Sequence, residues 1–291
     1  MKTRCRMSLL ATSIIWFVVA AVGQSQQPSR IWIPLLALNS HHEPVTNLAS
    51  DSLTVKVDKV QVSDVRLLRG PEMPLELGIL IDVSKSEQNR NLRELFAAAK
   101  DFAASALKGP DDRVFFMKFD TVPRATGWLT REQIPNLSED QRAGGGTALY
   151  DAVASAVQNH MAQPDWDRPA RRILIVISDG EDNSSHVTRA AAIADAVSSG
   201  VVIFAFDASR TSDMGDKVME GIAKRTGGMS FSAYSERNIR EDFSKVLHSL
   251  EGTYLLNFTA PPGSGVTKNV EVKPVGGEKM EIIYPNGSSR Q

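Results

Sequence analysis

Three short segments of the 291-residue chain carry hydroxyl and carboxylate side chains at spacings that suit a metal site. They are Asp82-Val83-Ser84-Lys85-Ser86, the glycines 144–146 with the following Thr147, and Ser178-Asp179-Gly180. Their oxygens are hard ligands of the kind that Mg²⁺, Mn²⁺ and Ca²⁺ prefer. Because only two carboxylates and no histidine or cysteine take part, the set predicts Mg²⁺ or Mn²⁺ with several retained waters, and Ca²⁺ less readily. The candidate ligands are Asp82, Ser84, Ser86, Thr147 and Asp179.

The elements beside these segments predict that the five side chains meet. An apolar run from Leu75 to Val83 and a β-branched run from Ile173 to Ile177 indicate two buried strands. Thr147 comes at the start of a helix predicted over Ala148 to Met161. In open α/β sheets ligands bind at the carboxyl ends of the strands. Since glycine also allows close backbone approach and sharp turns, we expect the three segments to form one site.

From about Pro74 to Leu250 the pattern alternates strands with helices. Such alternation predicts an α/β fold with a doubly wound, mostly parallel sheet and helices on both of its faces. The predicted strands are Leu75–Val83, Arg113–Phe119, Ile173–Ile177, Val201–Phe206 and Met229–Tyr234. The predicted helices are Leu92–Ala106, Ala148–Met161, Ala190–Val197, Val218–Arg225 and Ile239–Leu250.

The two flanks of this region contain short strand-like runs separated by Pro, Gly, Asn and Asp. They cover residues 31–70 and 252–285, and neither is long enough to build a stable core by itself. We therefore predict that the N-terminal and C-terminal flanks pair with each other into one small β-sandwich beside the α/β domain, which we place at residues 74–250.

Residues 1–23 have the pattern of a signal peptide. Positive residues come first, an apolar run from Met7 to Val22 follows, and small residues precede Gln24. An uncleaved anchor is the alternative, although the run is short for a membrane span. Cleavage would remove Lys2, Arg4 and Arg6, which takes the net charge from −1 to −4, together with Cys5, the single cysteine. We expect a secreted or periplasmic protein with no membrane insertion after cleavage.

The D-x-S-x-S, Gly-Thr and S-D-G elements, in this order on this background, resemble the metal-ion-dependent adhesion site (MIDAS) of von Willebrand factor type A domains. The resemblance covers about residues 74–250. The sequences of Gly145–Asp151 and Ser178–Asn183 are similar to those of secreted bacterial members with short β flanks, which are abundant in acidobacteria.

That resemblance implies a role for each candidate ligand. Ser84 and Ser86 would bind the metal directly, Thr147 would do so in the ligand-competent state, and Asp82 and Asp179 would act mostly through water. An Asp or Glu carboxylate of a protein partner would complete the octahedron. A divalent ion roughly neutralises two aspartates, so an incoming carboxylate would meet a near-neutral site. Lys85 departs from the small residue common in the family, and it could steer acidic partners or narrow the binding face.

The expected function is a metal-dependent adhesion or protein-binding module rather than an enzyme. Taken singly, each motif could be only a helix cap or a turn, but all three together in this order favour a metal site. A metal-dependent hydrolase is one alternative; it needs a general base, for which Lys85 is the one candidate within the motifs. A structural envelope protein with a non-essential site is another. A net charge of −1 and the lack of a Lys/Arg-rich tract give no support for nucleic acid as a partner.

The family resemblance also suggests a hypothesis about regulation. In this family the metal site can be coupled to a shift of the last helix, here Ile239 to Glu251. Because that helix runs directly into the C-terminal flank, the β flank could bias the site.

Overall fold

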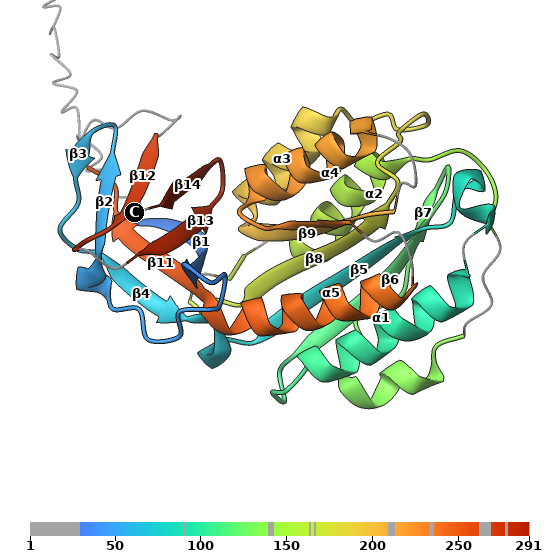
Figure 1. The fold of residues 1–291 in the computed structure, drawn as a ribbon, viewed down its shortest axis with the longest axis horizontal. Coiled ribbons are helices and arrows are strands. Elements are labelled where there is room, and N and C mark those ends of the chain that lie inside the picture. The colour runs from blue at the N-terminus through green and yellow to red at the C-terminus, as the bar shows by residue number, and fades with distance from the viewer. Residues whose placement is uncertain are drawn as a thin grey trace, which may run out of the picture.

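The computed structural model describes residues 30–89, 91–138, 143–162, 164–165, 167–208, 213–232, 236–261, 269–276 and 279–290. The predicted signal peptide, residues 1–23, lies outside these ranges and stays a prediction. Figure 1 shows an α/β domain on one side and a smaller all-β part on the other. Among the described helices, none has both the length and the apolar character that crossing a bilayer requires.

The α/β domain is built on a six-stranded sheet with the order β10-β9-β8-β5-β6-β7. All neighbours are parallel except β7, which pairs antiparallel with β6 at the edge. The central strands β5 and β8 are buried along nearly their whole length, as their uninterrupted apolar runs predict. The strands are β5 (Leu75–Asp82), β6 (Arg113–Phe119), β7 (Pro123–Ala125), β8 (Arg171–Ser178), β9 (Val201–Asp207) and β10 (Ser230–Ser232).

Helices cover both faces of this sheet, which confirms the doubly wound prediction. In Figure 1 helices α2, α3 and α4 lie above the sheet, and α1 and α5 lie below it. Each face has its own core: Phe96, Phe102 and Phe243 contribute to the lower one, and Leu149 and Ile193 to the upper one. The helices are α1 (Leu92–Ala106), α2 (Leu149–Ala156), α3 (Arg189–Ser198), α4 (Asp213–Thr226) and α5 (Glu236–Ser249).

Several predicted helices differ in their bounds from the structure; the helix predicted over Val218–Arg225, for example, begins at Asp213. The helix predicted over Ala148–Met161 is regular only to Ala156, and a π-helical turn continues it from Val157 to Met161. The last helix, α5, ends at Ser249, and a short 3-10 helix (Leu250–Gly252) leads from it directly into the all-β part.

The flanks pair into two antiparallel sheets, as predicted. One has the order β14-β13-β1-β11-β4 and the other β12-β2-β3. Strand β1 of the N-terminal flank lies between the C-terminal strands β11 and β13, and β2 pairs with β12. The strands are β1 (Arg30–Asn39), β2 (Leu53–Val57), β3 (Val60–Gln61), β4 (Arg66–Arg69), β11 (Thr253–Thr259), β12 (Val270–Pro274), β13 (Met280–Tyr284) and β14 (Gly287–Arg290).

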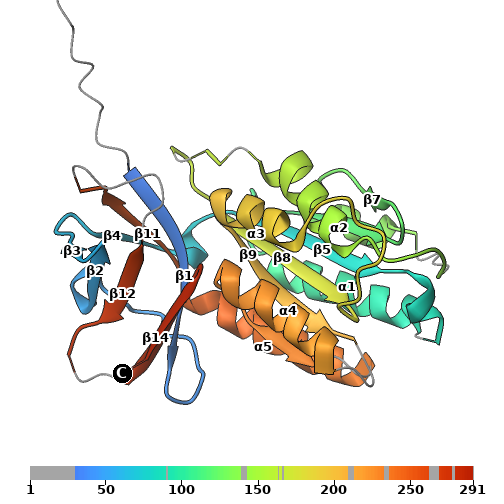
Figure 2. The same ribbon diagram turned by 90° about the horizontal axis from the view of Figure 1, so that it is seen from above.

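A single core joins the two flank sheets. In β2 the residues at alternate positions, Leu53, Val55 and Val57, are buried, while those between them are partly exposed. They pack in one cluster with Phe258 and Val272 from the C-terminal flank. Each flank therefore supplies apolar surface that the other covers. Figure 2 shows this β-sandwich beside the α/β domain.

Candidate metal centre

Asp82 is the last residue of β5 and is fixed by both neighbouring segments. Its side chain is buried, with 1% exposed. One carboxylate oxygen, Oδ1, accepts a hydrogen bond from the Ser84 amide at 2.8 Å, and Oδ2 accepts one from the Ser178 hydroxyl at 2.7 Å. Ser178 ends β8, the strand next to β5, so the central pair of strands aims this carboxylate at the carboxyl edge of the sheet.

Burial makes the charge of Asp82 costly in the metal-free protein. Removal from water raises the pKa of Asp82 to about 6, even though the hydrogen bonds from Ser84 and Ser178 favour the ionised form. The nearby charge of Asp179 raises the pKa further. A bound cation would favour the ionised form, so this carboxylate is suited to a cation.

The two serines of the first motif lie together beyond the strand end. The hydroxyl oxygens of Ser84 and Ser86 are 3.0 Å apart, and Ser84 is buried while Ser86 is exposed. A 3-10 helix, Lys85–Asn89, begins between them, with the Glu87 amide donating to the Ser84 carbonyl at 3.1 Å. Both hydroxyls therefore lie on one tight turn between the buried Asp82 and the surface.

The glycine segment packs directly against this turn. The Gly144 amide donates to the Val83 carbonyl at 2.9 Å, and the Lys85 amide donates to the Gly145 carbonyl at 3.2 Å. Gly145 has a φ of +74°, which favours glycine. At Gly146 a Cβ would lie 2.7 Å from Asn183 Oδ1 and closer still to Ser184 Oγ. Small residues are thus required for the approach that the sequence predicted.

Thr147 is held by the loop that carries Asp179. Its side chain is buried, and its amide donates to Asn183 Oδ1 at 2.9 Å. The next amide hydrogen bonds come from the first turn of α2: Leu149 N donates to Asp182 Oδ1 at 2.9 Å, and Tyr150 N donates to Ser185 Oγ at 3.0 Å. First-turn amides have no partner within a helix, so the 182–185 segment caps α2 from another part of the chain.

The sequence alone assigned no role to these capping residues. In the structure Asp182 is a cap for α2. Asp151 secures the far end of the same loop, since its Oδ1 accepts hydrogen bonds from the amides of His186 and Val187 at 2.9 and 2.8 Å. The loop bearing Asp179 and the helix following Thr147 therefore form one hydrogen-bonded unit.

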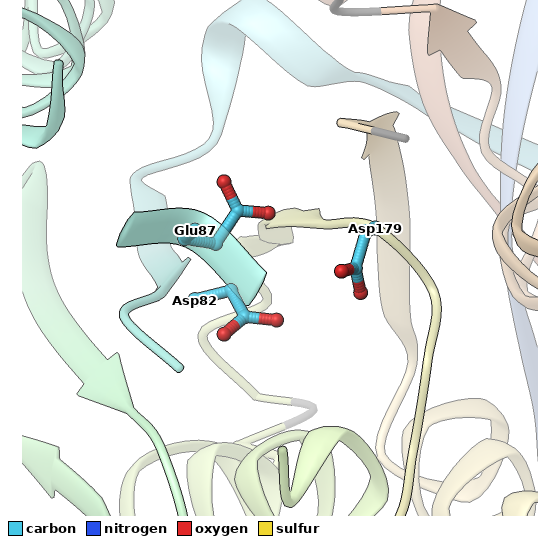
Figure 3. A group of neighbouring side chains, drawn as sticks. All are labelled: Asp82, Glu87 and Asp179. Carbon is cyan, nitrogen blue, oxygen red and sulfur yellow. The ribbon is translucent and has the colours of Figure 1, made fainter. Parts of the chain in front are cut away.

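The carboxylates of Asp82 and Asp179 meet, and a third acidic side chain joins them. Asp179 is partly buried, and its Oδ1 accepts a hydrogen bond from the Glu181 amide at 3.0 Å. One carboxylate oxygen from each of Asp82, Glu87 and Asp179 lies within 4.8 Å of the other two. Figure 3 shows the three carboxylates around a shared space, with Glu87 coming from the short 3-10 helix. The sequence predicted the two aspartates but not Glu87.

The chemistry of this donor set fits a divalent cation. Within the described part of the chain, no ion pair neutralises Asp82 or Asp179. Two ionised carboxylates at 4.8 Å repel by about 3 kcal/mol at an effective dielectric constant of about 20, and a divalent cation among them would reverse that repulsion. Carboxylate and hydroxyl oxygens are the ligands of Mg²⁺ and Mn²⁺. The five predicted ligands lie on three segments that are hydrogen-bonded to one another.

Comparisons with solved structures find similar proteins at low sequence identity. Proximal thread matrix protein 1 from the mussel byssus, with a zinc-occupied MIDAS motif, has a TM-score of 0.50 and 17% identity over 62% of this chain and 48% of its own length. A von Willebrand factor type A protein from Catenulispora acidiphila has a TM-score of 0.48 and 14% identity over 92% of this chain and 72% of its own. An aerotolerance-related membrane protein from Bacteroides fragilis has a TM-score of 0.42 and 17% identity over 60% of this chain and 98% of its own.

The family comparison is more specific. None of the curated proteins matches this chain. The profile of the von Willebrand factor type A domain matches residues 76–245, which is more than half of the 291 residues and includes every candidate ligand. The chain therefore belongs to the von Willebrand factor type A domain family.

Proposed function

We propose that this protein is a secreted or periplasmic module that binds a divalent cation at Asp82, Ser84, Ser86, Thr147 and Asp179. Through that cation it would hold an acidic residue of a protein partner. The observation that carries the proposal is the convergence of the Asp82 and Asp179 carboxylates at the edge of the sheet, beside the paired hydroxyls of Ser84 and Ser86. Domains of this family are commonly metal-dependent protein-interaction modules.

The ligand types favour Mg²⁺ or Mn²⁺. The motifs offer oxygen atoms only, and both ions take oxygen ligands in octahedral geometry. The mussel protein has zinc in its MIDAS motif, so zinc belongs among the ions tested. When bound, the metal would supply positive charge and an exchangeable coordination position for an anion.

The chain's own residues would orient the site and restrict access to it. Asp82 is held by two hydrogen bonds and cannot turn away from the edge of the sheet without breaking them. Ser86 is exposed, so the surface side of the site is the side open to a partner. Lys85 is exposed on the same turn and would attract acidic surfaces.

The location of the protein rests on the first 23 residues. The positive start, the apolar run and the small residues before Gln24 support export. The sequences of the motifs support the interpretation that the protein is one of the secreted bacterial members of the family, of the kind abundant in acidobacteria. In this proposal the flanks at 31–70 and 252–285 form one β-sandwich attached to the binding domain at 74–250.

Calorimetric titration of the purified protein with Mg²⁺, Mn²⁺ and Zn²⁺ tests the proposal. We expect saturable binding of one ion per chain, and its loss in Thr147→Ala. Thr188→Ala is the matched control, because Thr188 also lies at a helix start, where its hydroxyl accepts a hydrogen bond from Ala191 N at 3.2 Å, but it belongs to α3. The proposal fails if the folded wild-type protein binds none of these ions, with or without added acetate as a mimic of the partner's carboxylate.

A further inference from the structure

Glu87 has an unusual position for a glutamate on a short surface turn. It is the third residue of the 3-10 helix Lys85–Asn89, and only 5% of its surface is exposed. Its neighbours Ser86 and Gln88 are exposed. The carboxylate of Glu87 lies beside those of Asp82 and Asp179 (Figure 3).

The distances allow Glu87 to coordinate the same ion as the two aspartates. Oxygens of Asp82, Glu87 and Asp179 lie within 4.8 Å of one another. Around an octahedral ion with bonds of about 2.1 Å, adjacent oxygens are separated by about 3 Å and opposite ones by about 4.2 Å. Side-chain shifts of about an ångström would therefore bring all three oxygens onto one ion.

Coordination by Glu87 would have a consequence for partner binding. An octahedral ion offers six coordination positions, and the position that Glu87 takes would be closed to any other ligand. An acidic residue of a partner would then have to replace Glu87 at the ion instead of adding to it.

We infer that Glu87 is an internal ligand of the metal, which occupies the coordination position that a partner's carboxylate takes over on binding. This inference rests on the function proposed above and adds its regulation: the protein holds its ion without a partner, and partners compete with Glu87. The turn that carries Glu87 is short, so its release would require only local movement. The hydrogen bonds of the turn include those from Glu87 N to Ser84 O and from Lys85 N to Gly145 O.

The test is a titration with Mn²⁺ in chloride and in acetate, at equal pH and ionic strength, of the wild type and of Glu87→Gln. Loss of even an outer partner of a metal ligand lowers affinity about tenfold or more. We therefore expect Glu87→Gln to bind Mn²⁺ about tenfold or more weakly in chloride and to recover in acetate, which fills the vacated position. The wild type should bind equally well in both solutions.

Two further variants separate coordination from general charge effects. Glu181→Gln removes an exposed carboxylate from the loop of Asp179 and should behave as the wild type. Glu87→Asp keeps the charge but shortens the side chain, so it should also become acetate-dependent if Glu87 coordinates the ion directly. This variant also provides the test if Glu87→Gln does not melt cooperatively.

The outcomes distinguish this inference from the proposed function. If acetate strengthens Mn²⁺ binding equally in the wild type and in both Glu87 variants, Glu87 is not a ligand, while the metal site itself stands. If Glu87→Asp and the wild type are alike in both solutions, Glu87 acts only through its charge, and the inference is also overturned. If no protein binds Mn²⁺ even in acetate, the proposed function fails as well.

Discussion

Replacement of Asp82 by asparagine should stabilise the metal-free protein at neutral pH while abolishing its response to metal. Burial raises the pKa of Asp82 from 3.8 to about 6, a difference of about two units. Each unit corresponds to about 1.4 kcal/mol, so keeping this carboxylate ionised in the folded state costs about 3 kcal/mol at pH 8. Asparagine keeps the shape of the side chain without the charge, and Asp82→Asn should gain up to that amount.

The contribution of Asp82 to the free energy of unfolding depends on pH, and the two pKa values fix the direction of that dependence. The folded-state pKa lies above the unfolded one, so between pH 4 and 6 the folded state binds more protons. The stabilising contribution of the protonated Asp82 is therefore complete below about pH 4, and it is lost as the pH rises through 6. Urea denaturation without metal, at pH 4 and pH 8, should show the advantage of Asp82→Asn at pH 8 only.

Addition of Mg²⁺ at pH 8 should reverse the order of the two proteins. An ion that binds only the folded state adds about 4.1 kcal/mol at a concentration about 1,000 times its dissociation constant, which exceeds the advantage of about 3 kcal/mol expected for the variant. The wild type should gain this stability and Asp82→Asn should not. The reasoning is refuted if, without metal, the variant is no more stable than the wild type at pH 8, or if its advantage is the same at pH 4.

Three other expectations follow from the site. Because protons compete with the metal for Asp82, the affinity for Mg²⁺ measured by calorimetry should fall below about pH 6, by up to about tenfold per pH unit. Asp182→Ala removes a cap of α2 and should cost about 1 kcal/mol of stability, and also weaken Mg²⁺ binding about tenfold, whereas Thr188→Ala should cost similar stability and leave the affinity unchanged. Gly146→Ala should weaken Mg²⁺ binding because its Cβ would collide with the loop of Asp179. Gly144→Ala should not, because a Cβ there meets nothing within 4 Å. If the two variants had equal effects in thermal melts and titrations, the close approach at Gly146 would be contradicted.

The sequence could predict the strands and the meeting of the two aspartates because their signals are local. The apolar runs that end in Asp82 and Ser178 are continuous enough to indicate buried strands, and parallel neighbours end at the same edge. The structure confirms the result, with the Asp82 and Asp179 carboxylates within 4.8 Å. The run of three glycines also indicated a close approach of the backbone, and in the structure Gly145 has a positive φ.

Glu87 could not be predicted in the same way. A 3-10 turn of five residues has no periodic pattern, and the sequence around Ser86 is equally compatible with a glutamate that points into solvent. Its amide donates a hydrogen bond to the Ser84 carbonyl, a contact that exists only in the folded turn. The one available signal was an acidic residue directly after the first motif.

The capping of α2 was also beyond the sequence pattern, for a different reason. Asp182 and Asn183 accept hydrogen bonds from amides that are more than 30 residues away in the sequence. Helix caps are recognised from residues next to the helix, and α2 has no side-chain cap of its own at Ala148. Only the three-dimensional contact between the loop and the helix start reveals it.

The most direct test of the metal centre is an anomalous difference map from a crystal of the protein soaked in Mn²⁺. The site described here predicts one peak in the space among the Asp82, Glu87 and Asp179 carboxylates, within bonding distance of the Ser84 and Ser86 hydroxyls. A well-ordered loop with no peak in that space, or a peak bound only by other residues, would contradict it.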